Sequence, residues 1–374
     1  MKLISSLLLI IIILSNTLLQ AQDYLAPLDF RMLLSGTFGE LRGNHFHAGI
    51  DIKTQGVEGQ KVYSIADGYI SRIKVSTWGY GKVIYITHPK TGHTSVYAHL
   101  KKFSTNIDSI IKKEHYKKES FEINFYPNKD ALTVNKGEVI ALSGNSGGSD
   151  GAHLHFEIRD TQTERPTNPL QFGFNIADNI APTLKKIKIY ALDTTLIDGY
   201  RKSKIITINK KGDKYSIDET PTINGAFAVG IFTYDKLNDS YNKNGVYSIK
   251  LCVDTNICYQ FKVDELDFST TRYINAHVDY KEKKESKNQK SCRGQGYRPT
   301  RQQGRTGKVK DDIVMKRVFA DTALIPAGFG AAAAKTAYDK KSKAGKKAWR
   351  DMAGKGRKGG LQEVTPRMGQ KKVG

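Results

Sequence analysis

The stretch GAHLHFEIRD, residues 151–160, is typical of a β-strand and places two histidines one residue apart. Because side chains alternate between the two faces of a strand, His153 and His155 project to one side, and Leu154 and Phe156 project to the other. A single histidine in a strand is often a satisfied core or surface residue. Two imidazoles on one face indicate a shared partner, and a metal ion is the partner that we expect.

Two further stretches supply groups that suit a metal centre. HFHAGIDIK, residues 45–53, contains His47 and Asp51 four residues apart, and we expect Gly49 between them to let the backbone turn. VYAHLK, residues 96–101, contains His99. A catalytic zinc typically takes three protein ligands and leaves a fourth position for a water molecule, whose pKa it lowers toward neutrality. Histidines that do not bind the metal could then accept a proton and stabilise an oxyanion.

The segment from residue 36 to residue 169 alternates short β-rich runs with turns marked by glycine. This pattern predicts one antiparallel sheet. Its expected strands are GIDIKT (49–54), KVYSIADGYISRIKVS (61–76), GKVIYITH (81–88), HTSVYAHL (93–100), EVIALSG (138–144) and HLHFEIRD (153–160). One stretch differs: residues 104–120 have apolar side chains at positions 107, 110 and 111 among charges, which predicts a short helix or a surface excursion.

At these residues the sequence resembles the lysostaphin-type zinc metalloendopeptidases, which cut the peptides of bacterial peptidoglycan. The resemblance covers roughly residues 36–170. It rests on HFHAGIDI (45–52), GYGKVIYITH (79–88), SVYAHL (95–100), VNKGEVIALSGNSGGSDGAHLHFEIRD (134–160) and NPLQF (168–172). Compared with the simplest members of the family, residues 103–132 lengthen the connection after the histidine of SVYAHL, and we expect them to wall one side of the substrate groove.

The resemblance implies a role for each of five residues. In the family, the first histidine and the aspartate of the His-x3-Asp motif and the second histidine of the His-x-His motif hold one zinc ion. These positions correspond to His47, Asp51 and His155. The histidine of the Tyr-x-His-Leu stretch and the first histidine of His-x-His are catalytic in the family, and they correspond to His99 and His153.

Two neighbouring residues keep open roles. His45 lies two residues before His47 and could face the same way, but the spacing to Asp51 favours His47 as the ligand and leaves His45 to line the groove or to support a ligand. Glu157 shares a face with the two histidines of the strand. It either orients an imidazole or is a surface carboxylate.

The resemblance therefore implies a zinc endopeptidase that hydrolyses peptide bonds in peptidoglycan stems or cross-bridges. The alternative is a module of the same fold that binds cell-wall peptide, or regulates a hydrolase, without turnover. The residues do not decide which bond is cut, since a bond between D-alanine and diaminopimelate and a glycine bridge suit the same metal chemistry.

The N-terminus is typical of an export signal. Lys2 precedes an almost wholly apolar run, residues 3–14, and Ala21 is the expected last residue of the signal peptide. The run is shorter than the ~20 residues of a membrane-spanning helix, which favours a cleaved signal over an anchor. We therefore expect an exported protein of the periplasm, cell envelope or extracellular space, with no transmembrane span after signal removal.

We expect four regions: a signal peptide (1–21), a zinc metallopeptidase domain (22–178), a β-sandwich-like accessory domain (179–282) and a basic low-complexity tail (283–374). The fold class is therefore mainly β. In the accessory region Cys252 and Cys258 flank a turn and could form a disulfide or remain two thiols. His277 stands alone there, and we expect it on the surface of a strand.

The formal charge of +22 is concentrated in the tail. Residues 281–374 carry 26 Lys+Arg against 8 Asp+Glu, a net charge of +18, whereas the first 280 residues carry a net charge of only +4. This composition predicts disorder. It is typical either of a fusion or frameshift into other coding sequence or of a cationic arm that contacts anionic wall polymers. Nucleic acid is not an expected partner.

Overall fold

The computed structural model describes residues 24–212, 214–253, 256–279, 281–282 and 307–308. All of them lie in the first of two units of the chain, residues 1–329. The expected signal peptide and nearly all of the expected tail lie outside the described residues. Within the part of the chain that the structure describes, no helix is long and apolar enough to cross a membrane.

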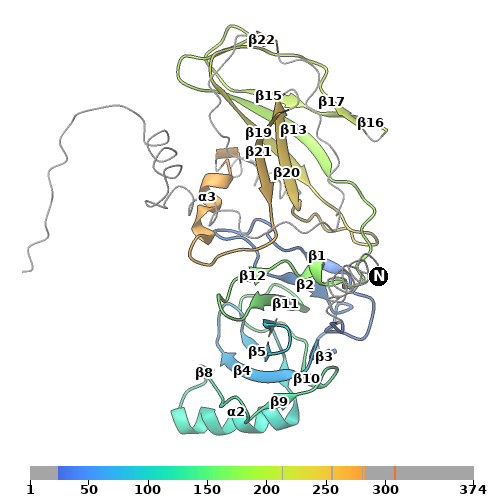
Figure 1. Ribbon diagram of the computed structural model, residues 1–374, viewed down its shortest axis with the longest axis vertical. Coiled ribbons are helices and arrows are strands. Elements are labelled where there is room, and N and C mark those ends of the chain that lie inside the picture. The colour runs from blue at the N-terminus through green and yellow to red at the C-terminus, as the bar shows by residue number, and fades with distance from the viewer. Residues whose placement is uncertain (1–23, 213, 254–255, 280, 283–306, 309–374) are drawn as a thin grey trace, which may run out of the picture. The chain divides into compact units, whose positions relative to one another are not determined.

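A sheet of nine strands forms the centre of the first half of the chain (Figure 1). Its order is β1-β2-β11-β6-β5-β4-β8, and β12 and β9 pair with β11 and β4 at its margins. All pairs are antiparallel, as expected. The strands are β1 (Leu34–Gly36), β2 (Ile50–Lys53), β4 (Gly68–Val75), β5 (Lys82–His88), β6 (His93–Ala98), β8 (Ile123–Phe125), β9 (Thr133–Val134), β11 (His153–Asp160) and β12 (Pro166–Thr167).

A second, three-stranded sheet corrects the expectation of a single sheet. It consists of β3 (Lys61–Tyr63), β10 (Val139–Leu142) and β7 (Lys102–Phe103), in the order β3-β10-β7. The run 61–76, which the sequence predicts as one strand, therefore contributes to two sheets. Its SIADG segment is the reason, because the backbone of Ser64 bonds to residues 137 and 138 before the chain enters the large sheet at Gly68.

The main core lies against one face of the large sheet. Ile50 and Ile52 of β2 and Leu154 and Phe156 of β11 are fully buried in it. Burial of each such side chain contributes roughly 1.5–3 kcal/mol to stability. Because strand side chains alternate, this burial fixes the intervening polar residues of β2 and β11 on the opposite face.

The insertion after β7 forms α2 (Thr105–Lys118), so of the two expected alternatives the helix is confirmed. Ile107 and Ile111 are buried in the main core, and β8 follows at the far edge of the large sheet. β6, β5 and β4 separate β8 from β11, which corresponds to about 19 Å at the usual spacing of strands. The expectation that this insertion walls the groove beside the histidines is therefore wrong for α2. The helix buries its apolar residues in the main core, which lies on the opposite face of the sheet from the histidines.

The region beyond residue 179 is also mainly β, as expected. Its sheets are β15-β13-β19, β14-β18-β22, the pair β16-β17 and the hairpin β20-β21. The elements are β13 (Thr183–Ala191), β14 (Leu196–Ile197), β15 (Lys204–Thr207), β16 (Asn209–Lys211), β17 (Lys214–Ser216), β18 (Thr222–Asn224), β19 (Phe227–Tyr234), β20 (Ser248–Val253), β21 (Asn256–Lys262) and β22 (Gly307–Lys308). The short helical elements are η1 (Pro169–Phe172), η2 (Thr271–Tyr273) and α3 (Ile274–His277).

The apolar side chains of this region are buried in two separate cores. One core is formed by this region alone and contains Ile187, Ile189 and Ile206. The other is the main core, which also receives Leu237, Phe261 and Val263. The domain boundary at residue 178 stays a prediction. Cys252 and Cys258 are not joined in a disulfide.

His277 is buried and helical, which corrects the expectation of a strand surface position. The centroid of its ring lies 4.4 Å from the ring centroid of Phe261 and 5.6 Å from that of Phe46. A residue of β21 and a residue next to His47 thus pack on the same imidazole. The packing ties the C-terminal part of the described chain to the loop that carries the first expected ligand.

Stability should depend on pH through His277. Burial lowers its pKa from 6.5 to about 4. Between these values the unfolded chain binds a proton that the native protein excludes, so the free energy of unfolding falls as the pH decreases from 6.5. The total loss is about 3 kcal/mol. His277→Phe should remove this component: between pH 7 and pH 5, wild type should lose about 2 kcal/mol more than the variant in urea denaturation. Equal losses in both proteins would contradict this assignment.

Candidate metal centre

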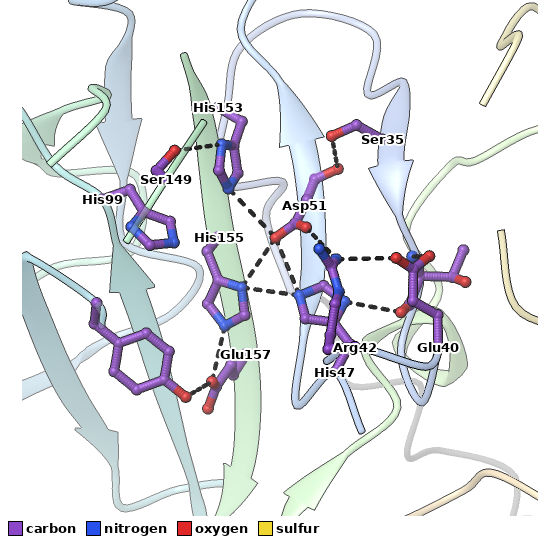
Figure 2. A network of polar contacts seen from close by, with 12 residues as sticks. Ser35, Glu40, Arg42, His47, Asp51, His99, Ser149, His153, His155 and Glu157 are labelled. Atoms are coloured by element: carbon purple, nitrogen blue, oxygen red, sulfur yellow. Dashed lines mark hydrogen bonds and ion pairs between the residues drawn. The ribbon is translucent and has the colours of Figure 1, made fainter. Parts of the chain in front are cut away.

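Three buried side chains converge on one point of the polar face of the sheet (Figure 2). Register places Asp51 of β2 opposite His155 of β11, and His47 comes from the loop that precedes β2. His155 Nδ1 lies 3.0 Å from Asp51 Oδ1 and 3.0 Å from His47 Nε2. His47 Nε2 lies 3.1 Å from Asp51 Oδ1. One nitrogen or oxygen of each residue is therefore placed to bind a single metal ion.

The second polar atom of each of these side chains is bound elsewhere. His47 Nδ1 donates to the carbonyl oxygen of Thr37 at 2.8 Å, which leaves its Nε2 without a proton in the neutral ring. Asp51 Oδ2 accepts from Arg42 Nη2 at 2.6 Å, so Oδ1 remains for the metal. His155 Nε2 lies 2.8 Å from Glu157 Oε1 and donates to it. Such outer contacts orient ligands and fix imidazole tautomers, so the donor set fits a metal.

Glu157 is fully buried, which decides between its two open roles: it orients an imidazole and is not a surface carboxylate. Its other oxygen accepts from Arg159 Nε at 2.7 Å, and the hydroxyl of Tyr80 donates to Oε1. Burial alone would raise the pKa of Glu157, but Arg159, His155 and Tyr80 lower it to about 2. The carboxylate is therefore charged when it accepts from His155.

The charges of the three donors suit a divalent cation. Burial alone would raise the pKa of Asp51, but His47, His153 and His155 hold it well below its usual range. Burial alone would lower the pKa of His155, but Asp51 and Glu157 raise it to about 9. Without a metal, the His155 ring is thus protonated on both nitrogens at neutral pH, and each nitrogen faces one carboxylate. Two imidazoles and one carboxylate are a ligand set that zinc accepts in catalytic sites.

His45 does not join this group. Its side chain is exposed, and its Nδ1 lies 2.8 Å from the side-chain oxygen of its neighbour Asn44. His47, which the spacing to Asp51 favours as the ligand, is the histidine that lies in the donor group.

His99 and His153 lie beside the three donors, with ring centroids 4.8 Å apart. His99 Nδ1 donates to Ser146 O at 2.8 Å, and His153 Nδ1 donates to Gly151 O at 2.8 Å. In its neutral form, each ring then carries no proton on Nε2. Burial, followed by the charges of His155 and His153, lowers the pKa of His99 to about 4. His153 Nε2 lies 3.5 Å from Asp51 Oδ1.

The backbone of His99 has a left-handed conformation, with φ of 59°, that is uncommon for residues other than glycine. The loop after β10 packs against this turn of the backbone and bonds to it through Ser146 N and His99 O. There Gly144 approaches so closely that a Cβ atom would lie 2.4 Å from the backbone nitrogen of Lys101. Backbone strain of this kind is concentrated at functional sites, where the surrounding structure enforces it.

The backbone bends at Gly49, as expected, and this glycine also allows a close approach to β11. A Cβ atom there would lie 2.4 Å from Phe156 O and 3.0 Å from His155 Nε2. Gly49→Ala should therefore push β11 from the loop, lower the metal content and cost about 1–3 kcal/mol in the free energy of unfolding. Gly43→Ala is the matched control, because nothing lies within 4 Å of its added Cβ. Metal analysis and urea denaturation test both variants, and equal behaviour would show that Gly49 has room.

Three residues of the site were not predicted from the sequence. Arg159 follows Glu157 by two positions in the same strand, so alternation could have placed it on this face. Tyr80 and Arg42 lie in loops, and no pattern in the sequence indicates their contacts.

Comparison with known proteins connects this site to a family. Residues 45–116 match Peptidase family M23. An uncharacterized metalloprotease of Haemophilus influenzae is 33% identical over 124 residues, which are 33% of this chain and 20% of the relative. The DD-carboxypeptidase/endopeptidase Mpg of Neisseria meningitidis serogroup B is 34% identical over 151 residues, which are 39% of this chain and 28% of the relative. The chain thus matches less than a third of the length of either curated relative.

Among solved structures, the catalytic domain of the antimicrobial peptidase lysostaphin from Staphylococcus simulans aligns at 21% identity with a TM-score of 0.29, over 38% of this chain and 91% of that one. The sequence match to the family ends before β11, but the register of β11 with β2 brings His155 to the His47–Asp51 pair inside the matched segment. The match to peptidase family M23 therefore covers His47, Asp51 and His99, and the fold adds His155 to them.

Proposed function

We propose that the protein is an exported zinc metalloendopeptidase that hydrolyses peptide bonds in peptidoglycan. The observation that supports it most is the arrangement of two imidazoles, His99 and His153, whose Nδ1 atoms bond to main-chain carbonyls, beside a buried group of three metal donors. The name of the Neisseria relative, a carboxypeptidase and endopeptidase, supports the substrate class.

In this proposal His47 Nε2, Asp51 Oδ1 and His155 Nδ1 hold the ion. Zinc, when bound there, supplies a Lewis acid that lowers the pKa of water and polarises a carbonyl. Thr37, Arg42 and Glu157 keep the three ligands in position through the contacts described above.

His99 and His153 handle the proton and the developing charge. An unprotonated Nε2 can accept the proton of an attacking water molecule, and once protonated it can donate to an oxyanion or to the leaving amine. Their main-chain hydrogen bonds to Ser146 and Gly151 aim both Nε2 atoms away from the backbone. One imidazole serves as proton acceptor and the other as oxyanion stabiliser.

Export is part of the proposal, because peptidoglycan lies outside the cytoplasmic membrane. Lys2 and the apolar run of residues 3–14 support an N-terminal signal that directs the chain there.

The function is tested by incubating the zinc-loaded protein with peptidoglycan sacculi, with and without a chelator, and identifying released fragments by mass spectrometry. The expected result is chelator-sensitive release of peptides with new amino ends. Binding to sacculi without release, at one zinc per chain, would contradict turnover and support a binding or regulatory module.

A further inference from the structure

Lys53 lies on the same face of the sheet as the candidate metal ligands. It follows Asp51 by two residues in β2, and the buried Ile52 between them projects into the core. Register places Lys53 opposite His153, whereas Asp51 lies opposite His155. The lysine side chain therefore starts beside His153, about 7 Å along the strand from the ligand Asp51.

A distant segment of the chain holds this lysine in place. Lys53 Nζ donates to Ser240 Oγ at 3.2 Å and lies 4.3 Å from the ring centroid of Tyr241. The Ser240 hydroxyl donates its own proton to Leu34 O at 3.0 Å, so its oxygen is free to accept from the ammonium. Tyr241 is 85% exposed, and its ring stands at the surface over the lysine.

The positive charge at this position has no anionic partner among the residues that the structure describes. The acidic side chains of the large sheet and its loops pair with other cations, such as Arg42, Arg159 and Lys101. An ammonium has three donors, of which Ser240 uses one. Lys53 therefore retains donors for a ligand, and its position in β2 lies opposite the proposed catalytic residue His153.

We propose that Lys53, positioned by Ser240 and Tyr241, is a subsite that binds a free carboxylate of the peptide substrate. This inference rests on the proposed function and narrows its substrate class. An extended peptide advances about 3.4 Å per residue, so the carboxylate belongs to a residue one or two positions from the cleaved bond. Stem peptides carry such carboxylates and glycine bridges do not, so the subsite selects stem peptides.

Binding to an inactive protein tests the subsite apart from turnover. Two synthetic stem peptides, identical except that one carries the carboxylate as a carboxamide, are titrated by calorimetry into zinc-loaded His153→Ala protein. The acid should bind about tenfold more tightly, which corresponds to about 1.4 kcal/mol. Adding Lys53→Met should abolish this preference, adding Lys53→Arg should retain part of it, and the control Lys61→Met, on the exposed end of β3, should leave it unchanged.

The outcomes separate this inference from the proposed function. Equal binding of acid and amide, or a preference that survives Lys53→Met, would overturn the subsite even where wild type cleaves both peptides. Failure of wild type to cleave either peptide would count against the endopeptidase, whereas a preference that Lys53→Met abolishes would still support the subsite. Unfolding temperatures verify each variant, and chelator-treated wild type provides the same comparison if His153→Ala protein does not fold.

Discussion

Replacement of His155 with alanine is expected to abolish metal binding and peptidase activity together. Its Nδ1 is 3.0 Å from both Asp51 Oδ1 and His47 Nε2, so the substitution removes one of three donors at the centre of the group. A bound metal contributes several kcal/mol of transition-state stabilisation, so we expect activity to fall by at least about 10³-fold. Zinc content, measured by elemental analysis after dialysis, should fall from one per chain to near zero.

His45→Ala is the matched control for this prediction. The exposed His45 is the histidine nearest in sequence to His47, and its side chain contacts Asn44 and not the donor group. The control should keep its zinc and its activity. Retention of zinc by His155→Ala would refute the ligand assignment, and loss of zinc from His45→Ala would identify His45 as a ligand. Loss of His155 removes a shared partner of the buried Asp51 and Glu157 carboxylates, and this loss could unfold the protein. Circular dichroism therefore accompanies both variants, to separate loss of zinc from loss of structure.

The part of this site that can be predicted from the sequence is the part that follows from the alternation of side chains along single strands. Alternation in HLHFEIRD places His153, His155 and Glu157 on one face, and alternation in GIDIK does the same for Asp51. Burial of the intervening apolar residues then excludes every register that is shifted by one residue, because such a shift would turn a core face outward. Which residues share the polar face thus follows from a simple pattern of apolar and polar positions.

Contacts between loops are not encoded in such a pattern. Arg42 reaches Asp51 because Gly36 leaves room, since a Cβ atom there would lie 2.5 Å from Arg42 Nη2. Glu157 is buried because Tyr80 comes from a loop 77 residues earlier in the chain. His277 and the helix of residues 105–118 were misplaced for the same reason: each is positioned by apolar partners that are distant in sequence.

Loss of His153 or His99 should separate catalysis from metal binding. Neither side chain is one of the three donors, and both hold their Nδ1 atoms on backbone carbonyls. We expect His153→Ala and His99→Asn each to retain one zinc per chain and to lower kcat by about 10²–10⁴-fold, the usual contribution of a positioned acid or base. Asparagine is chosen at position 99 because it tolerates the left-handed backbone there better than alanine does.

The double variant tests whether the two imidazoles act on one step. Groups that act as a unit show strongly non-additive losses, so His153→Ala combined with His99→Asn should cost little more in kcat than the worse single variant. Multiplied losses would instead indicate independent roles. Full activity in His153→Ala would remove this residue from the mechanism, because its Nε2, 3.5 Å from Asp51 Oδ1, would then be close to the metal without taking part. Zinc loss from either single variant would mean that the group of metal donors extends beyond His47, Asp51 and His155.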